Sequence, residues 1–220
     1  MFYCPVCGAG APAAFYPCAS CRKKIEQTAL NSNSERNCRL CGIDLAGSES
    51  PCVECRSAAP YTPLTAVVCL GPWAGPLREW VSMLKYGGDA RLARYPAELL
   101  ARAVHCYWPD VPVVPVPPRP IRLFRDGFDP VQALTRQMSR LGVSVEHVLT
   151  RRGRRTQKNS SRIQRVSGEN LNFKLKKKDI RGSRIVFDDI STTGTTLKVC
   201  ASLLKEAGCT EVYGLVICKD

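Results

Sequence analysis

The sequence has little histidine: in 220 residues only His105 and His147 occur. Neither adjoins, in sequence, the carboxylate and hydroxyl motif described below, so we interpret both as structural and assign no catalytic residue or general base. The chain also lacks any run of about 18 apolar residues, which excludes a membrane-spanning helix. No charged and then apolar leader precedes Cys4, so we expect a soluble protein without membrane insertion.

Acidic residues are scarce as well. The chain has 19 Asp and Glu against 32 Lys and Arg, which gives a formal net charge of +13 and a pI of about 9.3. This imbalance favours anionic partners. At 24.2 kDa the chain can hold one core domain of ordinary size and a small appendage.

Cysteine is abundant, and eight of the 13 cysteines form four C-x-x-C pairs. The first two pairs recur 34 residues later with the same internal spacing, so the chain contains a tandem repeat. Four thiolates in each unit are the usual ligand set of a tetrahedral zinc site, and this cysteine usage is typical of a reducing cytosol. We therefore predict a cytoplasmic protein with two structural zinc ions, held by Cys4, Cys7, Cys18 and Cys21 and by Cys38, Cys41, Cys52 and Cys55.

Some alternatives for the cysteines stay open. Four cysteines can also hold an iron–sulfur cluster, although the paired spacing is closer to a zinc ribbon, and the ligands could pair across the two units. Short segments with few large apolar residues form no core alone, so we expect the metal to supply their folding free energy. Residues 22–37 are polar and are interpreted as the linker between the units. The single cysteines are interpreted as buried thiols: Cys69, Cys106, Cys200, Cys209 and Cys218.

From Thr65 onward, strand and helix patterns alternate, which predicts a parallel sheet covered by helices. Residues 64–70 and 111–117 are expected to be strands, the second one short because it contains prolines. Residues 76–86 should form a helix that ends at Gly87-Gly88, and a second helix should begin near Pro96.

The second half of the chain continues this alternation. Asp129 and Pro130 are a favourable N-cap and first-turn pair for a helix that ends at Gly142. Strands are expected at residues 143–149 and 212–218. Residues 151–184 contain 13 Lys and Arg against two acidic residues, a net charge of +11. The expected buried stripe of the helix is Val131, Leu134, Met138 and Leu141.

The most informative motif is a strand over residues 184–189, followed by a hydroxyl-rich turn that opens a helix. The turn offers backbone N–H groups, hydroxyls and a glycine at the positive end of a helix, which suits a phosphate. The two adjacent carboxylates at the strand end can accept hydrogen bonds from sugar hydroxyls and orient a hydrated divalent cation. The alternative is an ordinary strand–turn–helix junction. We predict a ribose 5-phosphate site formed by Asp188, Asp189, Ser191, Thr192, Thr193, Gly194 and Thr195.

This motif resembles the motif with which type I phosphoribosyltransferases bind 5-phosphoribosyl 1-pyrophosphate (PRPP), which implies that Mg²⁺ accompanies PRPP. With the cysteine repeat, the stretch Gly75–Asp89 around Leu-Lys-Tyr and the strand Val114-Pro-Val-Pro117, nearly the whole chain is similar to the ComF family. The resemblance implies a double zinc-ribbon domain at residues 1–60. It also implies, at residues 61–220, a type I phosphoribosyltransferase-like parallel sheet with helices on both faces.

The resemblance assigns a pyrophosphate-binding loop to Pro117, Pro118 and Arg119. In the family this loop continues to an Arg-Gly-Phe-Asn signature, whereas this chain has Asp126 in place of the arginine, and a carboxylate there repels pyrophosphate. The resemblance also implies a mobile basic hood at about residues 150–183. A solvated loop is the structural alternative for the hood, whose expected nucleic-acid contacts are Arg151, Arg152, Arg154, Arg155, Lys158, Arg162 and Arg165.

Two functions compete. The ComF role in natural competence implies a protein that binds incoming single-stranded DNA and PRPP and works with other DNA-uptake proteins, such as a helicase. The charge of the hood favours nucleic acid, although Phe173 is its only aromatic residue. The alternative is an active phosphoribosyltransferase that transfers ribose 5-phosphate from PRPP to a small nitrogenous acceptor, whose identity a fold does not specify. We predict the first function and leave catalysis open.

Overall fold

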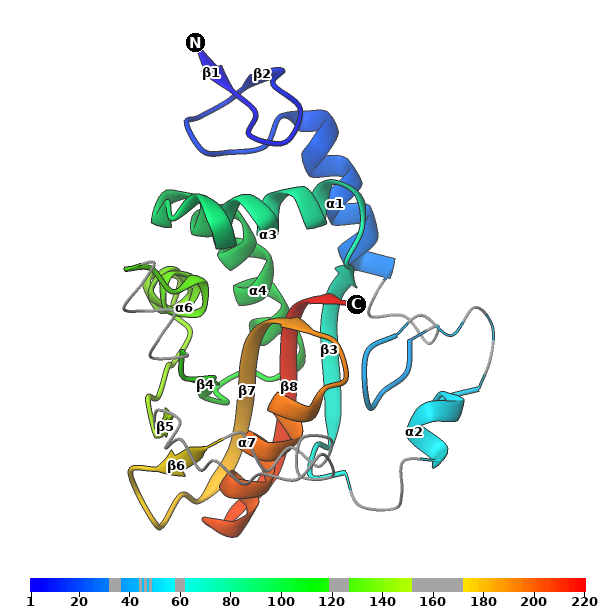
Figure 1. Cartoon of the computed structure of the whole chain (residues 1–220), viewed down its shortest axis with the longest axis vertical. Helices are drawn as coiled ribbons and strands as arrows, with labels where there is room; N and C mark the ends of the chain where they lie inside the picture. The colour runs from blue at the N-terminus through cyan, green and yellow to red at the C-terminus, as the bar shows by residue number, and fades with distance from the viewer. Residues whose placement is uncertain are drawn as a thin grey trace, which may run out of the picture.

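The computed structural model describes residues 1–31, 37–43, 45, 47, 49–57, 62–118, 127–151 and 172–220. Its centre is a four-stranded parallel sheet in the order β3-β8-β7-β4 (Figure 1). The strands are β3 (Ala66–Pro72), β8 (Cys209–Lys219), β7 (Gly182–Ser191) and β4 (Val113–Pro115). The predicted α/β class with a parallel sheet is confirmed.

The central strand β7 sends alternate side chains into two buried clusters. Ile185 and Phe187 share one cluster with side chains of α3 (Gly75–Gly87), α4 (Arg94–Tyr107) and α6 (Pro130–Arg140). Val186, between them, belongs to the other cluster together with side chains of α7 (Thr195–Glu206). Helices thus cover both faces of the sheet, as predicted, and β7 is fixed from both sides.

Local signals set the ends of the helices as expected. α3 ends at Gly87 and is capped by Gly88, which has a left-handed φ of 67°. At the start of α6, Asp129 Oδ1 accepts a hydrogen bond of 2.7 Å from the Gln132 backbone N–H. A 3₁₀ turn, η1 (Ala90–Ala93), precedes α4. The predicted buried stripe of α6 is wrong at Leu141, which is exposed because the helix ends at Arg140.

The predicted strand at residues 143–149 is wrong over most of its length. Val145 forms only an isolated bridge with Val113, because the chain runs beside β4 for one residue pair and then turns away. A strand begins only at β5 (Leu149–Arg151), which pairs antiparallel with β6 (Phe173–Leu175). β5 and β6 flank residues 152–171, the greater part of the basic hood, which lie outside the described residues.

The interpretation of residues 22–37 as a linker is also wrong for most of that segment. Helix α1 (Ala19–Asn31) continues directly from the first cysteine unit and lies against α3 and β3 (Figure 1). Ile25 and Ala29 are buried in the same cluster as the side chains of α3. Cys21, Ile25 and Ala29 recur every four residues, so they form an apolar stripe on one helix face, and the α/β core provides its partner.

The second cysteine unit lies against the outer edge of the sheet. The backbone N–H of Val67 in edge strand β3 donates a hydrogen bond of 2.8 Å to the Arg39 carbonyl. A Cβ atom on Gly42 would lie only 2.9 Å from Cβ of Cys69, so this unit packs closely on β3. The unit ends in a short helix, α2 (Val53–Ser57).

The burial of the single cysteines and the hydropathy of the helices can be compared with the sequence predictions. Four single cysteines are buried as predicted, whereas Cys106, near the end of α4, is exposed. Among the residues that the structure describes, no helix has both the length and the apolar character needed to cross a membrane.

Candidate functional site: an acidic pair beside a phosphate pocket, and two cysteine clusters

Asp188 and Asp189 lie at the carboxyl end of β7, in the interior of the sheet. The Asp189 backbone N–H donates a hydrogen bond of 2.9 Å to Asp188 Oδ1. Asp189 is buried, and its Oδ1 accepts a hydrogen bond of 2.8 Å from the Ile190 N–H. Each carboxylate is therefore oriented by one backbone donor.

A lysine to which the sequence analysis gave no role completes this acidic pair. Lys85 Nζ lies 3.1 Å from Asp189 Oδ2, and the two side chains are only 15% and 9% exposed. On α3, Lys85 follows the buried Leu77 and Val81 at intervals of four residues, so it continues the apolar stripe. A lysine in a buried stripe requires an anionic partner, and that position was the signal available in the sequence.

The acidic pair has an unusual protonation state. Burial and the negative charge of Asp189 raise the pKa of Asp188 to about 8, although the Asp189 N–H and the Lys85 ammonium act in the opposite direction. At neutral pH the Asp188 carboxyl is therefore largely protonated. A cation placed beside Asp188 would favour its ionisation, because the positive charge offsets the negative charge of the neighbouring Asp189.

After β7 the chain turns through Ser191 to Thr195 and enters α7. Gly194, with a left-handed φ of 72°, precedes the first residue of the helix, and its carbonyl accepts a hydrogen bond of 3.0 Å from the Lys198 N–H. Glycine adopts this conformation without strain. The turn and the start of α7 enclose a small pocket of about 40 Å³, which is lined by Asp188 and residues 190–197.

This turn pocket groups six of the seven predicted ribose-phosphate residues, and Asp189 adjoins them. The hydroxyls of Thr193 and Thr195 lie 2.8 Å apart, and the Thr193 hydroxyl also accepts from the Thr195 N–H at 3.4 Å. Hydroxyl groups at the positive end of a twelve-residue helix favour a bound anion. The arrangement can therefore hold a phosphate beside two carboxylates that accept hydrogen bonds.

The other predicted site residues are only partly described. The Val116 N–H donates a hydrogen bond of 2.9 Å to the Phe187 carbonyl. Pro117 and Pro118 therefore follow β4 at the carboxyl end of the parallel strands, the same end at which the acidic pair lies. The Arg151 guanidinium lies 4.8 Å from the centre of the Phe173 ring. Outside the described residues lie Arg119, Asp126, Arg152, Arg154, Arg155, Lys158, Arg162 and Arg165.

The histidines contribute nothing to this site. His105 Nε2 lies 3.2 Å from the carbonyl of Leu141, beyond the end of α6, and His147 is exposed. The described part of the site thus contains carboxylates, hydroxyls and one ammonium group.

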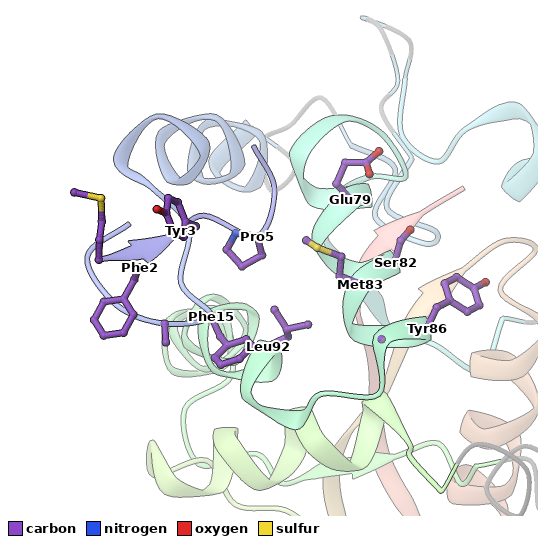
Figure 2. Close-up of a pocket in the computed structure, with 12 residues that line it drawn as sticks. Phe2, Tyr3, Pro5, Phe15, Glu79, Ser82, Met83, Tyr86 and Leu92 are labelled. Atoms are coloured by element: carbon purple, nitrogen blue, oxygen red, sulfur yellow. The ribbon is translucent and has the colours of Figure 1, made fainter. Parts of the chain in front are cut away.

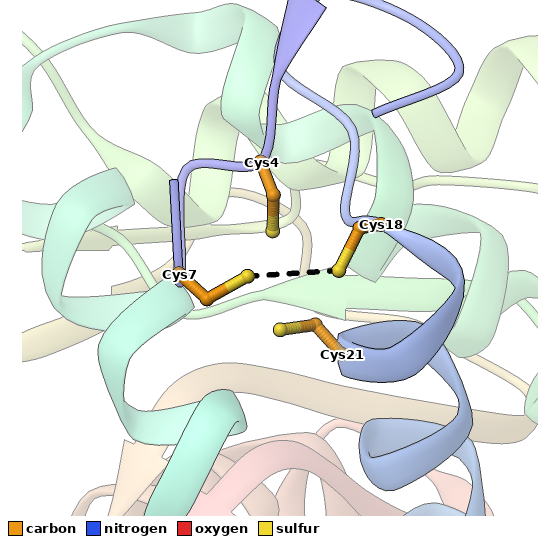
Figure 3. A group of neighbouring side chains, drawn as sticks. All are labelled: Cys4, Cys7, Cys18 and Cys21. Carbon is orange, nitrogen blue, oxygen red and sulfur yellow. Dashed lines mark hydrogen bonds between the residues drawn. The ribbon is translucent and has the colours of Figure 1, made fainter. Parts of the chain in front are cut away.

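The eight paired cysteines form two clusters, each built from a single unit, so the pairing lies within the units. In each cluster the ligand atoms all lie within 4.8 Å of one another, and Figure 3 shows the four thiols of the first cluster pointing toward a common centre. The Sγ atoms of Cys7 and Cys18 are 3.6 Å apart, and those of Cys41 and Cys52 are 3.8 Å apart. Four sulfurs around one zinc at about 2.3 Å lie about 3.8 Å apart, whereas disulfide sulfurs lie about 2 Å apart. Each cluster therefore has the spacing that can hold a zinc ion.

The two units also repeat in three dimensions. In the first, the Gly8 N–H donates to the Cys4 carbonyl at 2.9 Å, and in the second, the Gly42 N–H donates to the Cys38 carbonyl at 2.7 Å. Both glycines have a left-handed φ, of 75° and 76°. The duplicated sequence thus builds the same turn twice.

Backbone donors prepare these thiols for a metal. Burial raises the pKa of Cys4 and Cys38, but nearby backbone N–H groups outweigh burial and lower both pKa values to about 7. One of these donors is the Cys52 N–H, 3.3 Å from Cys38 Sγ. Burial instead raises the pKa of Cys21, Cys41 and Cys55. Since thiolates are the metal-binding form, Cys4 and Cys38 are the ligands prepared for a metal at neutral pH, and a bound cation would favour deprotonation of the others.

Comparison with known proteins agrees with this geometry. Residues 124–220 match the phosphoribosyl transferase domain family. The chain is 29% identical over 137 residues to Competence protein ComFC of Streptococcus pneumoniae (strain ATCC BAA-255 / R6), a match that covers 62% of this chain and 60% of that protein. The predicted resemblance to the ComF family is confirmed.

Two solved structures are also similar to this chain. One is an allosteric regulatory enzyme of purine biosynthesis, with a TM-score of 0.42, and the other is glutamine PRPP amidotransferase from B. subtilis, with a TM-score of 0.41. Each is 18% identical and covers 62% of this chain, and the match spans 30% of the other chain.

Proposed function

We propose that this ComF-family, phosphoribosyltransferase-like protein binds single-stranded DNA in competence-type DNA uptake and also holds a ribose phosphate such as PRPP. The observation that supports the ribose-phosphate site is the placement of Asp188 and Asp189 beside the turn pocket at the start of α7. The DNA-binding role is supported by the name of the relative, Competence protein ComFC, and by the net charge of +11 over residues 151–184. Other uptake proteins, such as a helicase, are the partners that this role implies.

In the proposed complex each part of the site has a separate task. The 5-phosphate occupies the turn pocket, where hydroxyls and the helix end stabilise its negative charge. Asp188 and Asp189 accept hydrogen bonds from the ribose hydroxyls. Lys85 keeps Asp189 in place through the ion pair of 3.1 Å and adds a positive charge to the site. Mg²⁺ bound with PRPP would neutralise pyrophosphate charge, and the acidic pair is the group that would orient it.

The same proposal gives each cysteine cluster one structural zinc ion. Each zinc ion would join the two C-x-x-C pairs of one cysteine unit. The buried cluster of the first unit consists mainly of its cysteines, so the free energy of metal binding would contribute directly to folding.

Phosphoribosyl transfer to a small nitrogenous acceptor is the second candidate function. It is favoured by the match of residues 124–220 to the phosphoribosyl transferase domain family. Transfer through a cation-like ribosyl transition state depends on positioning and charge neutralisation, which the acidic pair and Lys85 can supply.

Calorimetric titration tests the ribose-phosphate site. PRPP should bind only with a divalent cation, and Asp188→Ala or Asp189→Ala should weaken binding at least tenfold. The reason is that a hydrogen bond to a charged group contributes about 1.5 to 3 kcal/mol, and about 1.4 kcal/mol is tenfold. Asp179→Ala, which removes an exposed carboxylate paired with Arg181, is the matched control. If both site variants bind PRPP like the wild type, the motif is an ordinary turn.

Parallel titration with a single-stranded oligonucleotide and an assay for pyrophosphate release separate the two functions. Binding of DNA without pyrophosphate release supports the competence role. Release in the presence of a nitrogenous acceptor, without DNA binding, supports the enzyme instead.

A further inference from the structure

A large open groove, which shares no lining residue with the turn pocket, lies between the first cysteine unit and helix α3. It has a volume of about 880 Å³. One side is formed by the N-terminal hairpin of β1 (Phe2–Tyr3) and β2 (Gly10–Ala11) with the turn around Phe15, and the other side by the outer face of α3 (Figure 2). The ribose-phosphate proposal does not use this groove.

The groove collects exposed aromatic rings. Phe2, Tyr3 and Tyr86 line it and are 51%, 65% and 76% exposed, and Phe15 adds a fourth ring (Figure 2). Four of the eight large hydrophobic side chains that the described part of the chain exposes belong to this groove: Met1, Phe2, Tyr3 and Tyr86. Exposed aromatic rings are the platform on which unpaired bases stack, whatever their sequence.

The walls also carry polar groups suited to the edges of bases. The Glu79 carboxylate and the Ser82 hydroxyl lie on the α3 side, among the apolar rings (Figure 2). Base edges offer amino and ring N–H donors to such acceptors, whereas an aliphatic peptide side chain would bury them without a partner.

The surroundings of the groove favour a polyanion. Within residues 1–31, which form the first unit and α1, Arg22, Lys23 and Lys24 stand against a single acidic residue, Glu26. Beside the groove the Arg91 guanidinium lies 3.8 Å from the centre of the Phe15 ring, and it also forms an ion pair of 2.7 Å with Asp89. Arginine on an aromatic ring is a common element of single-strand binding sites. Phe15 holds this position with a positive φ of 58°, which is costly for an aromatic residue.

We propose that this groove binds the unpaired bases of single-stranded DNA by stacking on Phe2, Tyr3, Phe15 and Tyr86. The proposal rests on the DNA-binding function proposed above and supplies what the basic hood lacks, since Phe173 is the only aromatic residue between residues 151 and 184. The hood neutralises phosphates, and the groove holds bases. Helix α3 connects the groove with the ribose-phosphate site, because it lines the groove with Tyr86 and reaches Asp189 with the adjacent Lys85.

Binding of a labelled single-stranded oligonucleotide over a range of salt concentrations tests this division. The variants are Tyr86→Ala and the double variant Phe2→Ala/Tyr3→Ala. Loss of a stacking ring should weaken binding about 5- to 150-fold, which corresponds to about 1–3 kcal/mol per base. The slope of log K against log salt should stay unchanged, because no phosphate contact is lost. Tyr107→Ala is the matched control, since Tyr107 is 44% exposed but lies outside the groove.

An abasic oligonucleotide of the same length provides the second readout. It keeps the phosphates, so wild type and groove variants should bind it equally. Zinc content and melting temperature of each variant should match the wild type, because the altered rings are exposed.

Each outcome separates this proposal from the general one. If the wild type binds DNA and the groove variants bind it equally well, the groove proposal is overturned while the DNA-binding function stands. If the groove variants keep their DNA affinity but no longer bind a protein partner, the groove binds a peptide, and the groove proposal is again overturned. If the wild type binds no oligonucleotide, both proposals fail.

Discussion

Replacing Lys85 by methionine should destabilise the fold and weaken PRPP binding at the same time. Methionine keeps most of the side-chain volume in the buried stripe of α3, so the change reports chiefly the lost charge. Asp189 retains the hydrogen bond from the Ile190 N–H but loses its ion partner at 3.1 Å. Removing one member of a buried ion pair costs about 3–5 kcal/mol, and we expect the lower end because neither side chain is completely enclosed.

Thermal unfolding without PRPP measures this loss. For a chain of this size about 1 kcal/mol corresponds to about 2–4 °C, so Lys85→Met should melt about 6–12 °C below the wild type. Arg102→Met is the control, because Arg102 and Glu26 form an exposed pair at 3.5 Å, and such pairs contribute at most about 1 kcal/mol. The double variant Lys85→Met/Asp189→Asn should recover most of the lost melting temperature, since it leaves no unpaired buried charge. It should still fail to bind PRPP.

Three results would each refute a step of this reasoning. If Lys85→Met melts like the wild type, the ion pair contributes nothing to stability. If the double variant is no more stable than the single one, Lys85 does not act by compensating the charge of Asp189. Unchanged PRPP affinity in Lys85→Met would show that the lysine is not needed to orient Asp189 for the sugar.

Three further predictions follow from other parts of the molecule. Elemental analysis should find two zinc ions per chain, and Cys38→Ser should lose one of them and unfold the second cysteine unit while the α/β domain stays folded. Asp188→Asn should melt at a higher temperature than the wild type at pH 8.5 and show little difference near pH 4, because a carboxyl whose pKa is raised from 3.8 to about 8 reduces stability progressively as pH rises between those values. If about five phosphate contacts form on a single strand, log K for DNA should fall with log salt at a slope near −3.5, and neutralising the four arginines at 151, 152, 154 and 155 should flatten it by up to about 3. A slope that this quadruple variant leaves unchanged would contradict the role of the hood.

The turn pocket and the cysteine clusters could be read from the sequence because their residues are close together in it. Asp188 to Thr195 form one strand end, one turn and one helix start, so local conformation alone groups them. Each cysteine cluster likewise comes from a stretch of 18 residues. The cysteine spacing permits ligand sets within one unit or across both units. Only the fold shows that each cluster comes from a single unit.

Other features depend on contacts between distant parts of the chain. The partner of Lys85 lies on β7, far along the sequence, so only the packing of α3 on the sheet identifies it. From the sequence alone α1 resembles a linker, because its apolar stripe of Ile25 and Ala29 is narrow and indicates a helix only against the α/β core. The groove could not be anticipated either, because its rings come from β1, a turn and α3.

The strand expected at residues 143–149 failed for a related reason. Alternating apolar residues predict a strand only where a neighbouring strand is available. Residues 143–149 pair with β4 at only one bridge, between Val113 and Val145, although β4 continues to Pro115, and pairing resumes only where β5 meets β6.

The contact between the second cysteine unit and β3 has a consequence for solubility. An edge strand with unsatisfied backbone groups is a template for pairing with other chains, and here the Arg39 carbonyl occupies the N–H of Val67 at that edge. Gly42 allows the close approach that makes this cover possible. If the second cluster holds the proposed zinc ion, its chelation would therefore do more than release a small unit: it would uncover a strand edge at which whole protein chains could associate.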